Sequence, residues 1–176
     1  MTEDTQVRFL SDDLIINLTC NQKIPAYGRK ASFDKPLTTV SKRNKSDIRL
    51  DIFNKNRSYL GSILLDAKYM KLGTILKKVR NKESLKRQVT SYVNDTSSSY
   101  FENQKSGVLR DVRPVAALLV LYPSNDLDEN KEESQYIGQN VKYIQTKPGS
   151  DGDNLDKALT TSIKWICQRA VQLKIE

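Results

Sequence analysis

Three residues at the end of an apolar segment have types and spacing suited to catalysis: Asp66, Ala67 and Lys68. The side-chain period of a β-strand is two residues, so Asp66 and Lys68 are expected on one face, roughly 6.6–7 Å apart along the chain. The preceding alternating segment carries Asp47 and Asp51, which also share a face. If the two segments pair as a hairpin, one of these aspartates lies beside Asp66 with the lysine adjacent.

Two carboxylates held this close repel each other unless a cation lies between them. Mg²⁺ accepts one or two carboxylates together with waters, and it keeps positions open for a phosphate oxygen. Such an ion lowers the pKa of bound water, and a neighbouring ammonium group adds positive charge where the transition state is most negative. The pattern therefore predicts metal-dependent phosphodiester hydrolysis. The alternative is a strand end whose charges simply meet water, and Glu129-Asn130-Lys131 has the same spacing without a preceding apolar strand.

The distribution of positive charge also favours a polyanionic partner. The chain has a formal net charge of +8 and a pI near 9.4. Between Lys68 and Arg87 there are eight basic residues against the single acidic Glu83. This segment is interpreted as a nucleic-acid-binding surface, against the alternative of a solvated lysine-rich face. Its candidate contacts are Lys71, Lys77, Lys78, Arg80, Lys86 and Arg87.

Composition excludes several other classes. The 176 residues contain no histidine, which removes His-based general bases, Ser-His or Cys-His nucleophile pairs and His-containing zinc sites. The two cysteines, Cys20 and Cys167, are too few for a disulfide framework, so a cytoplasmic location is expected. The longest apolar run, Val115–Tyr122, is far short of a membrane span, and the first residues lack the pattern of a secretory signal.

The first half of the chain predicts strands. Residues 6–20 are typical of a hairpin that turns at Ser11-Asp12-Asp13. The region 24–45 is expected to be irregular. Asp47–Phe53 alternates as a half-buried strand, and Tyr59–Tyr69 is expected to be an inner strand covered on both faces.

The second half alternates helices and strands. Leu85, Val89 and Tyr92 form a helical stripe. A polar loop over 94–107 is expected next, then a buried strand over 114–122, an acidic loop over 124–134 and a strand over 141–145. A final helix over 154–173, capped by Asp153, closes the chain. The order predicts an α/β fold with a mixed sheet flanked by helices.

We expect one domain over residues 1–176, standing alone or as part of a longer protein. Within it, residues 1–45 form an N-terminal β extension that includes the hairpin. Residues 46–123 form the core with the motifs, and residues 124–176 form the acidic loop with the C-terminal strand and helix.

These motifs resemble those of the PD-(D/E)XK nuclease superfamily, which has the restriction-endonuclease-like fold. The likeness lies in Ser46-Asp47 opening one strand and in the Leu64–Tyr69 segment (LLDAKY) closing the next. The Gln88–Tyr92 segment (QVTSY) is similar to the helix motif of the RecB-like branch. The DAKY ending, Val120–Pro123 and Pro148-Gly149 look closest to McrC-type nuclease domains. In two respects the chain departs from the pattern: Ser46 stands in place of a proline, and no N-terminal helix is expected.

The resemblance implies specific roles. Asp47 and Asp66 would be metal ligands together with the backbone carbonyl of Ala67, with Asp51 as an alternative to Asp47. Lys68 would be the catalytic cation. Gln88 and Tyr92 would support the site or contact the DNA backbone. The implied cofactor is Mg²⁺, with Mn²⁺ as a substitute.

The sequence thus predicts a metal-dependent endonuclease domain acting on DNA in restriction, defence or DNA processing. Its expected partners are DNA and a motor or specificity domain or subunit, with no membrane. One alternative is a nucleic-acid-binding module on the same fold without catalysis. Another is a protein-interaction domain whose charge serves solubility alone.

Overall fold

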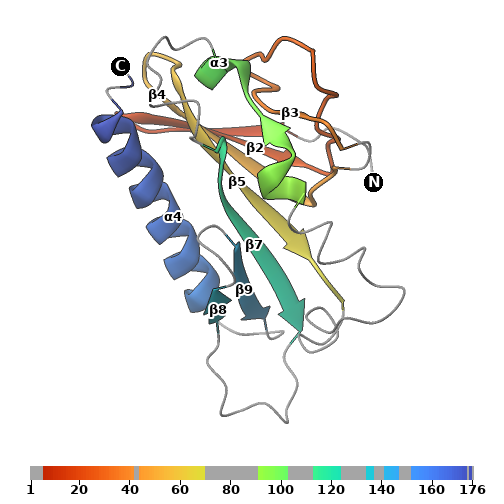
Figure 1. Ribbon diagram of the computed structural model, residues 1–176. Coiled ribbons are helices and arrows are strands. Elements are labelled where there is room, and N and C mark those ends of the chain that lie inside the picture. The colour runs from red at the N-terminus through yellow and green to blue at the C-terminus, as the bar shows by residue number, and fades with distance from the viewer. Residues whose placement is uncertain are drawn as a thin grey trace.

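The computed structural model describes residues 6–41, 44–69, 91–102, 113–123, 134–136, 141–146, 152–173 and 175. Seven strands form one sheet in the order β1-β2-β4-β5-β7-β9-β8 (Figure 1). Their bounds are β1 Gln6–Leu10, β2 Leu14–Cys20, β4 Ile48–Asn54, β5 Tyr59–Ala67, β7 Val115–Pro123, β8 Ser134–Tyr136 and β9 Val141–Thr146.

The sheet is mixed. β1, β2, β4 and β5 follow one another as an antiparallel meander, whereas β7 and β9 are parallel to β5, and β8 returns antiparallel to β9. The predicted hairpin at residues 6–20 and the predicted mixed sheet flanked by helices are confirmed. The N-terminal hairpin belongs to the same sheet as the core strands.

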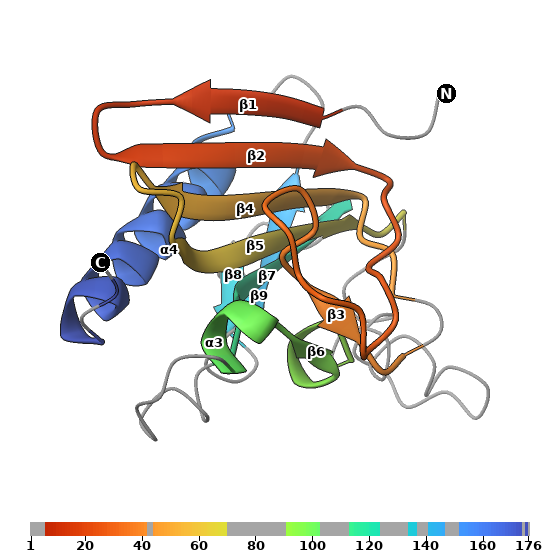
Figure 2. The same cartoon turned by 90° about the horizontal axis from the view of Figure 1, so that it is seen from above.

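The two faces of the sheet are covered by different elements. Helix α4 (Asp153–Gln172) packs on one face. The other face carries the loop after β2, the small sheet of β3 (Thr38–Thr39) and β6 (Thr96–Ser97), and α3 (Ser99–Glu102) (Figure 2). β5 lies between these layers, and all its residues except Ala67 are buried, as expected for an inner strand.

Helix α4 is fixed to the sheet by an arginine as well as by its apolar stripe. The guanidinium of Arg169 donates from Nη1 to the carbonyl of Arg113 (3.0 Å) and from Nη2 to the carbonyl of Leu60 (2.8 Å). It also lies 4.8 Å from the ring centroid of Trp165. The backbone can approach this closely because residue 61 is a glycine, where a Cβ atom would lie 2.7 Å from Nη2.

Several local predictions were wrong. Asp153 does not cap α4: the N-cap is Gly152 in a left-handed conformation, and Asp153 already has helical geometry in the first turn, where its charge suits the helix dipole. The predicted loop over 94–107 contains β6 and α3. Long-range hydrogen bonds hold these short elements, including one between the hydroxyls of Thr38 and Ser97 (2.9 Å).

The predicted acidic loop over 124–134 ends earlier than expected, because β8 begins at Ser134. Among the described residues, no helix combines the length and apolarity needed to cross a bilayer.

Candidate active site

The register between β4 and β5 brings two aspartates together. Ile48 pairs with Leu65 in this antiparallel ladder, so the next position outward places Asp47 opposite Asp66. Side chains directly opposite each other in such a pair project from the same face of the sheet. The backbone N–H of Ala67 donates to Oδ2 of Asp47 at 2.6 Å, which fixes this carboxylate against the end of β5.

The carbonyl of Ala67 faces the same side. The N–H and C=O groups of one residue in an extended strand point to the same neighbour. Because the N–H of Ala67 points to Asp47, its carbonyl oxygen is directed toward the Asp47 side of β5. Two carboxylates and a backbone carbonyl therefore gather at one strand end.

Lys68 completes the group. Its Nζ atom lies 2.6 Å from Oδ2 of Asp66, and the side chains of the lysine and aspartate are only 12% and 5% exposed. The backbone N–H of Lys68 donates to the carbonyl of Leu121 in β7 (2.7 Å), so the main chain that carries the ammonium group is fixed to the sheet. An aspartate pair and an amine thus converge as the spacing of the sequence predicts.

The carboxyl of Asp66 is held in an unfavourable environment for its charge. Burial raises its pKa above 3.8, Lys68 opposes that rise, and the nearby carboxylate of Asp47 adds to it. Oδ2 of Asp66 is buried and, within the described part of the chain, has no hydrogen-bond donor of good geometry despite the closeness of Lys68. A further positive charge at this point would stabilise the ionised pair.

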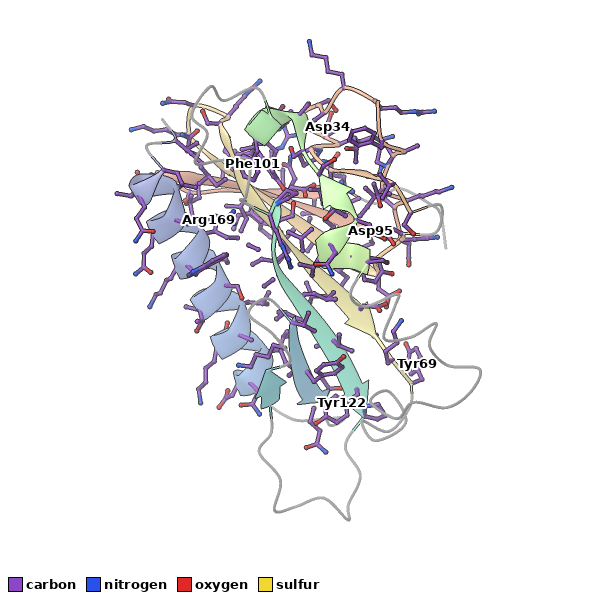
Figure 3. All side chains as sticks on the ribbon, viewed as in Figure 1. Asp34, Tyr69, Asp95, Phe101, Tyr122 and Arg169 are labelled. Carbon is purple, nitrogen blue, oxygen red and sulfur yellow. The ribbon has the colours of Figure 1, made fainter. Side chains whose placement is uncertain are left out.

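The site lies at the carboxyl end of β5. β5 and β7 are parallel, so their carboxyl ends coincide, and ligands of open α/β sheets bind at such ends. Figure 3 places Tyr69 and Tyr122 together at this end of the sheet. The side chain of Tyr69, next to Lys68, is 96% exposed.

Asp51, the alternative metal ligand, has a different role. Its Oδ2 accepts from Nε of Arg49 at 2.8 Å and its Oδ1 accepts from the hydroxyl of Ser62 at 2.5 Å. Both Arg49 and Asp51 are buried, and Asp51 lies opposite Ser62 in the ladder, four residues from Asp47. The interpretation of Asp51 as the ligand is wrong, because both of its oxygens are already bonded and it is not beside Asp66.

Tyr92 is buried against the segment that leads to Asp47. The residue is fully buried, and its hydroxyl donates to the carbonyl of Lys45 at 2.6 Å. Its neighbour Ser91 donates to Oδ1 of Asn44 (2.9 Å), and the amide of Asn44 donates back to the carbonyl of Ser91 (3.2 Å). These bonds tie the helical residues 91–94 to the chain just before Asp47. The prediction that Tyr92 contacts the DNA backbone is therefore wrong.

Asn44 and Ser91 were not predicted from the sequence. They lie 47 positions apart, and nothing in their local patterns signals that they bond to each other. The remaining predicted residues lie outside the described part of the chain and stay predictions. They are Gln88, Lys71, Lys77, Lys78, Arg80, Lys86 and Arg87.

The donor set fits a hard divalent cation with few protein ligands. The described residues contain no group of three acidic, cysteine or histidine side chains suited to a metal. Mg²⁺ commonly keeps several waters and binds through one or two carboxylates, so Asp47, Asp66 and the Ala67 carbonyl suffice for it. A zinc site, which takes four tightly held ligands, does not match this set.

Comparisons with protein-family models, with curated proteins and with solved structures found no match for this chain.

Proposed function

We propose that the chain is a metal-dependent nuclease domain of the PD-(D/E)XK type that hydrolyses DNA phosphodiester bonds. The observation that carries the proposal is the convergence of Asp47, Asp66 and Lys68 at the carboxyl end of β5. Their types and spacing match the motif that the sequence resembles, and the chain carries a net positive charge suited to DNA.

In this mechanism Asp47, Asp66 and the carbonyl of Ala67 would hold Mg²⁺ or Mn²⁺. When bound, such an ion would lower the pKa of a coordinated water and neutralise negative charge on the phosphate. Water adds to phosphorus and the bond to the leaving oxygen breaks, giving a phosphate monoester and a free hydroxyl. Lys68 supplies positive charge and hydrogen bonds beside the reacting phosphate, since its ammonium is held 2.6 Å from the ligand Asp66.

The electrostatics of Asp66 agree with a cation-binding role. Burial and the neighbouring Asp47 raise the pKa of this carboxyl, and Lys68 offsets that rise only in part. A divalent cation held by the two carboxylates would offset both the desolvation penalty and their mutual repulsion. The fold leaves the ionised carboxylates only partly stabilised, and a bound cation would supply the rest of the stabilisation.

We place the domain in cytoplasmic DNA restriction, defence or processing, with a motor or specificity domain as partner. The two cysteines are free, as expected in a reducing compartment. The sequence contains no zinc-finger spacing, and sequence preference would come from loops or from a partner domain.

Plasmid nicking tests the proposal. Supercoiled DNA is incubated with and without Mg²⁺ and with the wild type, Asp66→Ala or Lys68→Ala. The same substitutions at exposed positions, Asp12→Ala and Lys55→Ala, serve as matched controls. We expect Mg²⁺-dependent nicking by the wild type and both controls, and none by the two site variants. Nicking that persists in Asp66→Ala and Lys68→Ala would refute the site assignment.

A binding module without catalysis is the second candidate. It is favoured by one observation: Nζ of Lys68 lies 2.6 Å from Oδ2 of Asp66, so this carboxylate already has a cationic partner within the chain. That function predicts no nicking with any metal, together with DNA binding that weakens steeply as salt rises. Filter binding at two salt concentrations beside the nicking assay distinguishes the two functions.

A further inference from the structure

The pairing of β2 with β4 continues beyond the ends of both strands, past the candidate site. The N–H of Asn21 donates to the carbonyl of Asp47 at 2.8 Å, and Lys23 and Lys45 then form an isolated antiparallel bridge. The bridge keeps the register of the preceding ladder, in which Cys20 pairs with Ile48. Two lysines therefore lie directly opposite each other, two positions beyond Asp47.

This arrangement is electrostatically unfavourable in the free protein. Opposed residues of an antiparallel pair project from the same face, and like charges at such positions are destabilising. Both lysines are exposed, and in the part of the chain that the structure describes neither has an acidic group within ion-pair distance. An anion bound between the two ammonium groups would reverse the sign of this interaction.

The alternation of burial directs the lysine pair toward the site. Asn44 and Ser46 are buried, whereas Lys45 is exposed and Asp47 is half-buried. Lys45 and Asp47 thus lie on the same side of the chain, roughly 6.6–7 Å apart as alternate residues of an extended segment. The bond from Tyr92 to the carbonyl of Lys45 fixes the main chain at this point.

We propose that Lys23 and Lys45 bind backbone phosphates of DNA next to the phosphate that is cleaved. The inference deepens the proposed nuclease function and rests on it. Lysine contacts to phosphates position a duplex without reading its sequence, and the continued register sets their distance from Asp47. The lysine pair would hold the DNA strand close to the metal-binding carboxylates.

Salt dependence of binding tests this role. Fluorescence anisotropy with a labelled DNA duplex is measured in EDTA, where no cleavage occurs, for the wild type and the double variant Lys23→Gln/Lys45→Gln. The matched control is Lys157→Gln/Lys164→Gln, which removes the same charge from exposed positions on α4, across the sheet. Nicking in Mg²⁺ is measured in parallel.

Loss of two phosphate contacts makes the plot of log K against log[salt] less steep by about 1.8. The ratio of Kd values between about 50 and 200 mM salt then falls roughly twelvefold relative to the wild type. The control keeps the wild-type slope. The melting temperature of the lysine variant stays equal or rises, because a repulsive pair is removed, whereas a structural role would lower it.

The outcomes separate the two proposals. A wild-type slope in Lys23→Gln/Lys45→Gln, with nicking retained by the wild type, overturns the phosphate-binding role alone. Absence of both nicking and DNA binding in the wild type overturns the proposed function and this inference together. A reduced slope without any nicking supports the lysine contacts and favours the binding module.

Discussion

The substitution Asp51→Asn tests whether Asp51 in β4 has a structural role, in contrast to Asp47, the proposed metal ligand. The substitution keeps the shape of the side chain and removes its charge. Arg49, which is 2% exposed, then has no buried carboxylate 2.8 Å from its Nε atom. Asp47 directly precedes β4 and has the same parity as Asp51, but it is half-buried, so Asp47→Asn is a matched control.

The expected loss is large. Removing one partner of a buried ion pair costs about 3–5 kcal/mol of the free energy of unfolding. For 176 residues, an unfolding entropy of about 2.1 cal/mol/K per residue gives about 0.37 kcal/mol/K. The melting temperature of Asp51→Asn should therefore fall by about 8–14 °C. Asp47→Asn can still accept from Ala67 and should lose about 1 kcal/mol or less.

Equilibrium unfolding in urea measures the change in the free energy of unfolding, and thermal unfolding measures the change in melting temperature. Both are followed by circular dichroism and by the fluorescence of Trp165. Nicking is assayed well below the melting temperature of each variant. We expect Asp51→Asn to be unstable but active and Asp47→Asn to be stable but inactive. A double variant, Arg49→Met/Asp51→Asn, should recover part of the loss, because no unpaired buried charge remains. A change below about 0.5 kcal/mol in Asp51→Asn, or loss of nicking by the folded variant, would refute the structural role.

Two further predictions concern Asp66 and Gly61. Burial raises the pKa of Asp66 in the folded state above 3.8, so the folded protein holds this proton more tightly than the unfolded chain does. The contribution of Asp66 to the free energy of unfolding is therefore fully present below pH 3.8 and is lost as the pH rises through the raised pKa. The Asp66→Asn variant cannot ionise at this position. In EDTA, the melting temperature of the variant minus that of the wild type should therefore increase as the pH rises through this range. A difference that does not change with pH would contradict the raised pKa. Gly61→Ala places a methyl group 2.7 Å from Nη2 of Arg169 at a φ of 150°, and we expect a loss of about 1–3 kcal/mol in urea unfolding, with unchanged stability as the contrary result.

Much of the fold could be predicted because its local patterns are strong. The alternation over Asp47–Phe53 and the apolar segment before Asp66 specified β4 and β5, and the period of the C-terminal segment specified α4. Short elements were missed for a physical reason. β6 and α3 have too few residues for a periodic pattern, and bonds such as that from Ser98 to the carbonyl of Pro36 (2.7 Å) hold them from far along the chain.

The candidate site divides in the same way. The sequence by itself determined that Asp66 and Lys68 share a face at a strand end, because the two-residue period of a strand is a local property. It left Asp47 and Asp51 equivalent, since both have the same parity. Only the tertiary structure decided between them: the register of β4 on β5 puts Asp47 opposite Asp66, and it buries Asp51 against Arg49. Register depends on how two strands meet, and no spacing within one strand can specify it.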